Sequence, residues 1–341
     1  MPGPRLEPKD PTFADFAARW FEDLRHELAP ATQARYDWEL THHLLPFFAG
    51  HRLSEITISE VDRYRAAKVR EGRLGATSIN MTLGRLAQII DTAIEYHPEL
   101  LRTNTARGRR RRLRSVTPHR TFLELEQVAA LLEAAGELDA QAVAAHRQAA
   151  RRAMLGSLVL GGLRIGELLA LRWGDVDLAA GRITVRQAKT SAGLREVEIG
   201  RLLGDALTEH RTRARSTRPE DLVFATATGR PHSRQNVRQR VLLPALDLAD
   251  AALRGRGAPP MPASVSPHSL RRTYISLMLQ AGENPRVVMA QVGHTDPDLT
   301  LRIYAQVMKR RERETGARVD ELVRGASAAD PTVGEPPRAS S

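Results

Sequence analysis

The chain has 341 residues and no cysteine, and its 51 lysine and arginine residues outnumber its 40 aspartate and glutamate residues, for a formal net charge of +11. The lack of cysteine excludes disulfides, thiolate metal ligands and a cysteine nucleophile. The length is sufficient for two domains, and the excess of positive charge favours a polyanionic partner, of which nucleic acid is the commonest.

No apolar stretch in the sequence is long enough to cross a membrane. The first ten residues are polar and rich in proline, which is typical of neither a signal peptide nor a membrane anchor. We therefore expect a soluble, cytoplasmic protein with no membrane partner. From Arg324 onward, alanine, serine, proline and glycine predominate, and this composition predicts a disordered tail.

Apolar residues at helical spacing predict four helices in the first third of the chain. These are residues 13–24, a second helix from Pro30 to near Pro46, a third capped by Ser59 and a fourth beginning near Thr77. Four helices in so short a segment are typical of a small bundle. Trp20 and Trp38 are expected in its core. His42 and His43 are adjacent and face different directions, so we expect both on the surface.

An arginine-rich run follows this bundle. Between Glu99 and Glu124 there are eight arginines and no acidic residue. The run interrupts the apolar periodicity and predicts a domain boundary. Such a concentration of like charge is either a solvated linker or a segment neutralised by a polyanion. The candidate DNA-binding residues are Arg107, Arg109, Arg110, Arg111, Arg112 and Arg114.

The next region predicts a helix over about 140–160, with Met154, Leu155, Leu158 and Val159 apolar, that ends at Gly161 and Gly162. Arg164 follows directly in an apolar neighbourhood. A buried arginine is costly unless it is paired. Glu167 lies one helical turn away and is the expected partner.

Alternating apolar residues then predict three short strands, at 176–178, 182–187 and 195–199. Lys189 falls at the tip of the hairpin between the second and third strands. It is one of only four lysines among the 51 basic residues, which draws attention to it. Two helices are expected at 201–215 and 233–250, followed by a loop over 251–265.

Ser266 and Pro267 predict a helix start, with serine as the cap and proline in the first turn. This start places His268 in the first turn and Arg271 one turn later on the same face. Gly293 is expected to end the next helix and leave His294 just beyond it. Tyr304 is expected on a helix that begins near Thr300.

These residue types suit a phosphate substrate. Arginine presents a fixed fork of donors that matches phosphate, histidine exchanges protons near neutral pH, and tyrosine offers a nucleophilic hydroxyl. A metal site at His268 and His294 is not expected, because no carboxylate stands at ligand spacing beside them and the arginines repel a cation. Tyr274 lies inside an apolar helix and is expected to pack there.

In this order, Gly161-Gly-Leu-Arg164-Ile-Gly-Glu167, Lys189, His268-Ser-Leu-Arg271, Gly293-His294 and Tyr304 resemble the tyrosine recombinases of the phage integrase family. The resemblance covers residues 12–320. It implies a mainly α fold with a small antiparallel β-sheet, in which an N-terminal SAM-like core-binding bundle precedes a catalytic domain. The expected divisions are 1–11 (flexible), 12–106 (core-binding), 107–120 (basic linker), 121–324 (catalytic) and 325–341 (disordered tail).

The resemblance also implies a role for each motif residue. Arg164 and Arg271 would clamp the scissile phosphate, with Glu167 as the supporting acid. Tyr304 would attack phosphorus and form a 3′-phosphotyrosyl bond. Lys189 would protonate the leaving 5′-oxygen, while His268 assists proton transfer and His294 hydrogen-bonds the phosphate. Arg272 and Val292 depart from the residues common in the family, but both lie outside these roles.

The implied function is site-specific DNA recombination without metal, ATP or another cofactor. The expected partners are double-stranded DNA, three further copies in a homotetramer on paired sites, and an accessory directionality protein. In free solution the chain is expected to be a monomer, and in the cell to associate with the nucleoid. No separate arm-type DNA-binding domain is expected before residue 12. Alternatives are a topoisomerase-like enzyme and a non-catalytic DNA-binding protein, and residues 309–323 dock either on a neighbouring protomer or on their own domain.

Overall fold

The computed structural model describes residues 10–115, 121–142, 150–186 and 194–293, together with Ile303 and Ala305. The chain divides into two compact units, Met1–Pro118 and His119–Ser341, and each is considered by itself. Within the described ranges, no helix is long and apolar enough to cross a membrane.

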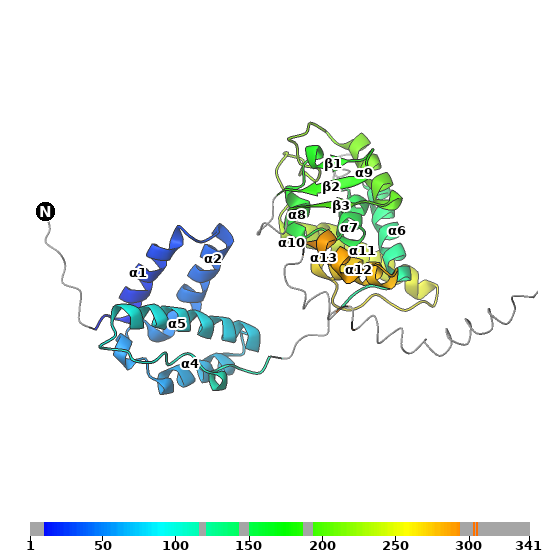
Figure 1. The fold of residues 1–341 in the computed structure, drawn as a ribbon. Coiled ribbons are helices and arrows are strands. Elements are labelled where there is room, and N and C mark those ends of the chain that lie inside the picture. The colour runs from blue at the N-terminus through cyan, green and yellow to red at the C-terminus, as the bar shows by residue number, and fades with distance from the viewer. Residues whose placement is uncertain are drawn as a thin grey trace, which may run out of the picture. The chain divides into compact units, whose positions relative to one another are not determined.

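The first unit is helical (Figure 1). Its described helices are α1 (Phe13–Arg25), α2 (Pro30–Glu39), a π-helical turn (Leu40–Leu44), α3 (Leu45–Phe48), a 3₁₀ turn (Leu53–Glu55), α4 (Ile58–Glu71), α5 (Ala76–Tyr96) and a second 3₁₀ turn (Arg109–Arg111). Thr12 caps α1 by accepting a hydrogen bond from Asp15 N–H. Helix α5 passes between the pair α1 and α2 and helix α4, so its apolar face supplies the centre of the core (Figure 1).

The second helix ends at Phe48, close to its predicted stop near Pro46. Before that end it passes through a π-helical turn, in which Leu45 N–H donates to Leu40 O. Proline lacks an N–H and crowds the carbonyl four residues before it, and the wider π turn relieves both problems without ending the helix. The same solution recurs in the second unit, where a π-helical turn at Arg238–Leu242 precedes Pro244.

The structure corrects three predictions for this unit. Thr57, rather than Ser59, caps α4, because its side chain accepts from Glu60 N–H. Trp38 is 42% exposed, whereas Trp20 packs in the core as expected. His43 is buried and packs edge-on against Trp38, whereas His42 is exposed as predicted. Periodicity at 3.6 residues per turn does not anticipate the π turn that carries both histidines.

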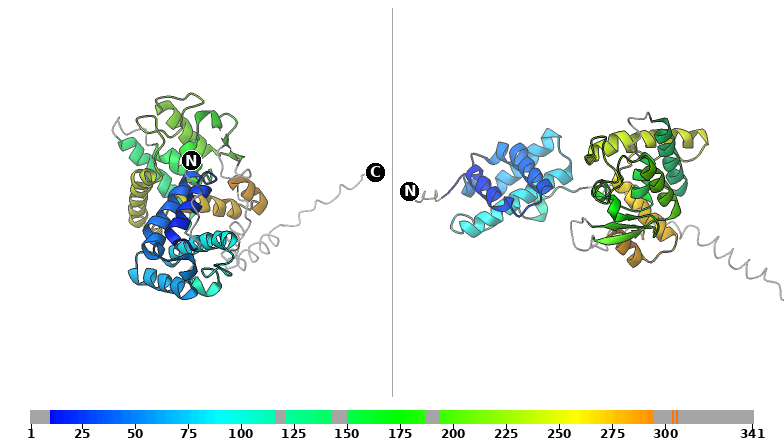
Figure 2. Two further views of the ribbon diagram at one scale, coloured as in Figure 1. Left: turned by 90° about the vertical axis from the view of Figure 1, so that its left-hand side faces the viewer. Right: turned by 90° about the horizontal axis from the view of Figure 1, so that it is seen from above.

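The second unit combines helices with a small sheet at one edge (Figures 1 and 2). Its described elements are α6 (Leu125–Gln141), α7 (Arg151–Val159), α8 (Ile165–Ala170), a 3₁₀ turn (Trp173–Asp175), β1 (Val176–Asp177), β2 (Arg182–Val185), β3 (Arg195–Glu198), α9 (Arg201–Arg213), α10 (Arg234–Val237), the π turn, α11 (Leu243–Gly255), α12 (Pro267–Gln280) and α13 (Pro285–Val292). The strands form one antiparallel sheet in the order β1-β2-β3, with Ile183 opposite Val197 and Val185 opposite Arg195.

The core of the second unit confirms the predicted apolar faces. Met154, Leu155, Leu158 and Val159 on α7 are fully buried, together with Ile183 and Val197 of the sheet. Helix α11 extends to Gly255, so the first five residues of the predicted 251–265 loop are helical instead. Ser266 caps α12 and Gly293 ends α13 with φ of 61°, both as predicted. A mainly α fold with a small antiparallel sheet is confirmed.

A buried ion pair joins two helices of the first unit. Arg85 Nε on α5 lies 2.8 Å from Glu39 Oε2 at the end of α2, and both side chains are almost fully buried. The Arg85 guanidinium also stacks on the Tyr36 ring, 3.0 Å from its centroid. Removing one partner of such a pair leaves an uncompensated charge in a medium that solvates it poorly.

Glu39→Gln should therefore lower the free energy of unfolding of the first unit by about 3–5 kcal/mol, measured by urea denaturation of the full chain. Glu22→Gln is the matched control, since Glu22 pairs with Arg25 on the exposed surface of α1 at 3.6 Å. That variant should change stability by less than about 1 kcal/mol. Equal effects of the two substitutions would contradict a structural role for the buried pair.

Candidate active site and nucleic-acid surface

Arg164 is held at the start of α8 by Glu167. Arg164 is the N-cap residue, and its backbone N–H donates to Glu167 Oε2 at 2.8 Å. Its guanidinium Nη1 donates to Glu167 Oε1 at 2.6 Å. The pairing that the sequence predicted is present, and the helix start fixes both residues together. The Arg164 side chain is nevertheless 41% exposed, so part of its guanidinium remains accessible to a ligand.

A second arginine shares the same carboxylate. Arg195, the first residue of β3, donates from Nη1 to Glu167 Oε1 at 3.0 Å and from Nη2 to Glu167 Oε2 at 2.9 Å. Its Nε donates to Gln291 O in the last turn of α13 at 2.7 Å. The Glu167 carboxylate therefore joins α8 to β3, and Arg195 joins both to α13.

Glu167 remains ionised although it is buried. Burial alone raises the pKa of a carboxyl group, but the hydrogen bonds from Arg195 and from the Arg164 backbone outweigh it and hold the pKa of Glu167 below its usual range. Because the folded-state pKa is lowered, the stability contributed by the ionised carboxylate is present above the unfolded-state pKa. It is lost as the pH falls through the folded-state value.

Arg271 lies one turn into α12 and is only 1% exposed. Its Nη1 donates to Gly162 O and its Nη2 to Val292 O. Its Nε has no hydrogen-bond partner among the described residues, and none of their carboxylates forms an ion pair with it. Burial, and then repulsion by Arg164, lower the pKa of Arg271 to about 9. At neutral pH it is therefore a buried cation held by neutral carbonyl groups.

The C-terminal end of α13 brings the two arginines together. Arg271 donates to Val292 O, and Arg164 Nη2 donates at 2.6 Å to the next carbonyl, Gly293 O. These carbonyls would otherwise lack partners, because they lie at the end of the helix. The end of a helix also carries partial negative charge, which favours cations there. Two guanidiniums from distant parts of the chain are thus fixed side by side, as expected of a phosphate clamp.

Gly162 has a conformation that this arrangement requires. Its φ is 61°, and a Cβ at this position would overlap the ring of Tyr274. The close approach places the Gly162 carbonyl against Arg271. Tyr274 is buried as predicted, and burial raises the pKa of its hydroxyl. Such a tyrosine is a packing residue rather than an accessible nucleophile.

Of the four remaining predicted catalytic residues, the structure describes only His268. His268 is exposed on the first turn of α12, three residues before Arg271. Lys189, His294 and Tyr304 lie outside the described residues, so their predicted roles stay predictions. Ile303, directly before Tyr304, is helical and buried against the apolar cluster of α12 and α13.

The arginine run at 107–114 was predicted to be a linker, but it packs on the first unit. Arg110 O accepts from Arg65 Nη1 of α4 at 2.7 Å. The Leu113 backbone exchanges two hydrogen bonds with the Asn80 side chain of α5, at 2.8 and 2.9 Å. These contacts place the backbone as far as Leu113 on the first unit, and the predicted division at residue 107 stays a prediction.

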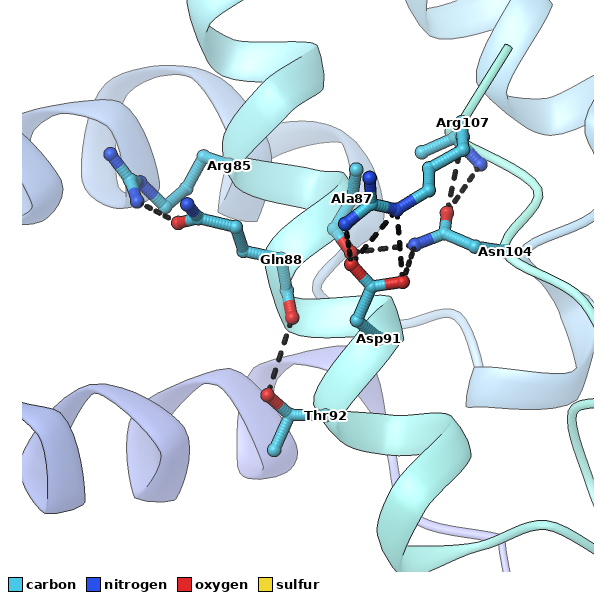
Figure 3. A network of polar contacts seen from close by, with 8 residues as sticks. Arg85, Ala87, Gln88, Asp91, Thr92, Asn104 and Arg107 are labelled. Atoms are coloured by element: carbon cyan, nitrogen blue, oxygen red, sulfur yellow. Dashed lines mark hydrogen bonds and ion pairs between the residues drawn. The ribbon is translucent and has the colours of Figure 1, made fainter.

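Arg107 of this run is committed to the fold. Its guanidinium pairs with Asp91 on α5, and Asn104 donates to the same carboxylate at 2.6 Å (Figure 3). These hydrogen bonds, Arg107 first, hold the pKa of Asp91 below its usual range. This pairing anchors the start of the arginine run to α5.

A groove of about 840 Å³ lies beside this network on the first unit. Arg107, Arg109 and Arg112 line it, together with Gln88 of α5. Arg110 and Arg114 are exposed but do not line it, and Arg111 is partly buried. A groove with several guanidiniums and few acids is a site that suits a polyanion.

Sequence reasoning missed Arg195. A signal was present: Arg195, Val197 and Ile199 alternate along one strand, and Val197 and Ile199 are apolar. An arginine in phase with inward-facing residues requires a buried partner. That partner, Glu167, lies 28 residues away in sequence, which periodicity does not reveal. No group of three or more potential metal ligands occurs among the described residues.

Curated proteins that resemble the chain are tyrosine recombinases and integrases. A tyrosine recombinase XerC from Halalkalibacterium halodurans is 32% identical over 177 residues, which is 49% of this chain and 53% of the relative. A tyrosine recombinase XerC from Serratia marcescens is 27% identical over 288 residues, covering 83% and 86% of the two chains. The chain thus spans only about half the length of some relatives that it matches.

Solved structures with the same fold include an integrase of transposon Tn1549 in complex with transposon right end DNA. It has a TM-score of 0.69 and 18% identity, covering 88% of this chain and 99% of the other. A lambda integrase tetramer bound to a Holliday junction has a TM-score of 0.63 and 18% identity, covering 87% and 84%. At this identity the likeness establishes the fold.

Two family models match the chain. The model described as phage integrase, N-terminal SAM-like domain, matches residues 12–68 of the first unit. The model described as phage integrase family matches residues 121–311, which include Arg164 and Arg271 and cover more than half of the chain. The chain belongs to the phage integrase family.

Proposed function

We propose that this protein is a site-specific DNA recombinase that cuts and rejoins DNA strands through a covalent tyrosyl intermediate. The observation that carries the proposal is the pair of guanidiniums, Arg164 and Arg271, anchored to successive carbonyls at the end of α13. In phosphoryl transfer, negative charge accumulates on the phosphate oxygens, so fixed cations supply most of the stabilisation. Membership of the phage integrase family supports the same chemistry.

In the proposed reaction, the Tyr304 hydroxyl attacks the scissile phosphorus. A phosphotyrosyl bond forms to the 3′ side as the bond to the 5′-oxygen breaks. The tyrosine proton passes toward His268, and Lys189 protonates the departing 5′-oxygen. Lysine suits this role because it gives up a proton far more readily than arginine. Attack by a 5′-hydroxyl on the intermediate reverses these steps and reseals the strand without ATP.

The arginine-lined groove of the first unit is the proposed contact with the DNA backbone, through Arg109 and Arg112. We further propose that four copies act together on paired sites. The structural similarity to a lambda integrase tetramer on a Holliday junction supports this assembly. An accessory directionality protein and a cytoplasmic, nucleoid-associated location belong to the same proposal.

Tyr304→Phe should abolish covalent attachment to DNA, because the nucleophilic oxygen is absent. The measurement uses nicked suicide duplexes derived from the flanks of the element that encodes the protein, with adducts separated on denaturing gels. DNA affinity of the variant should stay within about twofold of the wild type, since one hydroxyl contributes little to a contact dominated by phosphates. Tyr274→Phe is the matched control and should keep forming the adduct. A Tyr304→Phe protein that is still trapped on DNA would contradict the proposal.

Replacing both Arg109 and Arg112 with glutamine should weaken binding to all DNA sequences. The slope of log affinity against log salt should fall by about one per lost phosphate contact. The paired replacement of Arg110 and Arg114 makes the same charge change in the same segment, outside the groove, and should alter the slope less. If both double variants show the same slope, the groove is not the DNA site.

A further inference from the structure

Arg195 occupies an unusual place for a charged residue. It stands opposite Val185 in the sheet, two residues before the buried Val197. Residues directly opposite each other in an antiparallel pair lie on the same face of the sheet. The Arg195 side chain is accordingly only 5% exposed. Burying a guanidinium is costly, so its position requires strong compensation.

The compensation comes from Glu167 and from α13. Both terminal nitrogens of Arg195 bind Glu167, one to each carboxylate oxygen, at 3.0 and 2.9 Å. Its Nε binds Gln291 O, two residues before the carbonyl of Gly293 that accepts from Arg164. The Gln291 side chain in turn accepts from Glu198 N–H on the same strand at 3.4 Å. Arg195 thus binds the carboxylate that also holds Arg164, and a carbonyl of the helix whose last carbonyl anchors Arg164.

Glu167 has two oxygens, and each is shared. Oε1 accepts from Arg164 Nη1 at 2.6 Å and from Arg195 Nη1 at 3.0 Å. Oε2 accepts from the Arg164 backbone at 2.8 Å and from Arg195 Nη2 at 2.9 Å. The bidentate contact with Arg195 prevents the Glu167 carboxylate from rotating. The position of Arg195 therefore determines the orientation of the Arg164 guanidinium.

We infer that Arg195 is a positioning residue of the active site, which holds Glu167 and the end of α13 so that Arg164 is aimed at the scissile phosphate. The inference rests on the proposed recombinase function. In this positioning role, Arg195 does not contact the substrate. Its effect passes through Glu167 on one side and through the backbone of Gln291 on the other.

A lysine at this position keeps the charge but not the fork. Its single ammonium cannot bind both oxygens of Glu167 and also reach Gln291 O. Arg195→Lys should therefore slow single-turnover cleavage of a nicked suicide duplex by about 10–100-fold, the loss typical when a partner that orients a reactive group is removed. DNA affinity and the thermal unfolding midpoint should stay close to those of the wild type.

Arg182→Lys is the matched control. Arg182 lies on the same hairpin and pairs with Glu196 across the sheet at 3.4 Å, but both side chains are more than half exposed. The same chemical change there should leave the cleavage rate unaltered. Wild-type cleavage by Arg195→Lys, or an equal loss in both variants, would overturn the inference.

A modified substrate distinguishes whether Arg195 acts through Arg164 or through Lys189. A 5′-bridging phosphorothiolate has a leaving group that needs no proton, so it should restore cleavage by Lys189→Ala. It should not restore cleavage by Arg195→Lys, because the phosphate clamp serves both substrates alike. Rescue of Arg195→Lys by the phosphorothiolate would overturn the assignment to the clamp.

Glu167→Gln supplies a second route if Arg195→Lys fails to fold. Because Arg195 acts through Glu167, the cleavage rate of the variant with both substitutions should lie within about threefold of the rate of the slower single variant. If the two residues acted independently, their fold-losses in rate would multiply instead. If Arg195→Lys does not fold, Glu167→Gln alone should show the slowed cleavage without thiolate rescue, and normal cleavage by it would overturn the inference. Failure of the wild type to form any adduct would instead refute the recombinase function itself.

Discussion

The proposed active site depends on the interactions of one carboxylate, that of Glu167. It is buried, it stays ionised, and two guanidiniums from α8 and β3 share its oxygens. The buried carboxylate of Glu167 and the buried guanidinium of Arg195 would each be unstable alone, and together they satisfy each other's charge and hydrogen-bonding groups. The contacts of Glu167 and Arg195 join the start of α8, the strand β3 and the end of α13. Packing of these elements against one another therefore also aligns Arg164.

Arg271 has the opposite electrostatic situation. It is a buried cation with carbonyl partners, and burial lowers its pKa to about 9. Since the folded-state pKa lies below the unfolded-state value, stability rises with pH between these two values, and at neutral pH the charged form is held at a cost. An anionic phosphate beside it offsets that cost. The fold thus holds the uncompensated positive charge of Arg271 at the place where negative charge develops in the proposed reaction.

Much of the site follows from local signals in the sequence. The cap at Ser266, the stop at Gly293 and the pairing of Arg164 with Glu167 are all set by residues within one or two helical turns, and all are confirmed. Arg195 was not predicted as a site residue because its partner is distant in the chain, and the contacts of the arginine run were not predicted because its backbone partners lie on α4 and α5. The π turns were also unforeseen, since they depend on how a proline is accommodated within a continuing helix.

In the proposed reaction, a clamp of two guanidiniums presents a DNA phosphate to Tyr304. Mass spectrometry of the protein–DNA adduct, after exhaustive nuclease and protease digestion, tests this arrangement. We expect one modified peptide, with the 3′-phosphate of a nucleotide esterified to the Tyr304 hydroxyl and a free 5′-hydroxyl on the released strand. A linkage through another residue, or a 5′-phosphate attached to the protein, would contradict it.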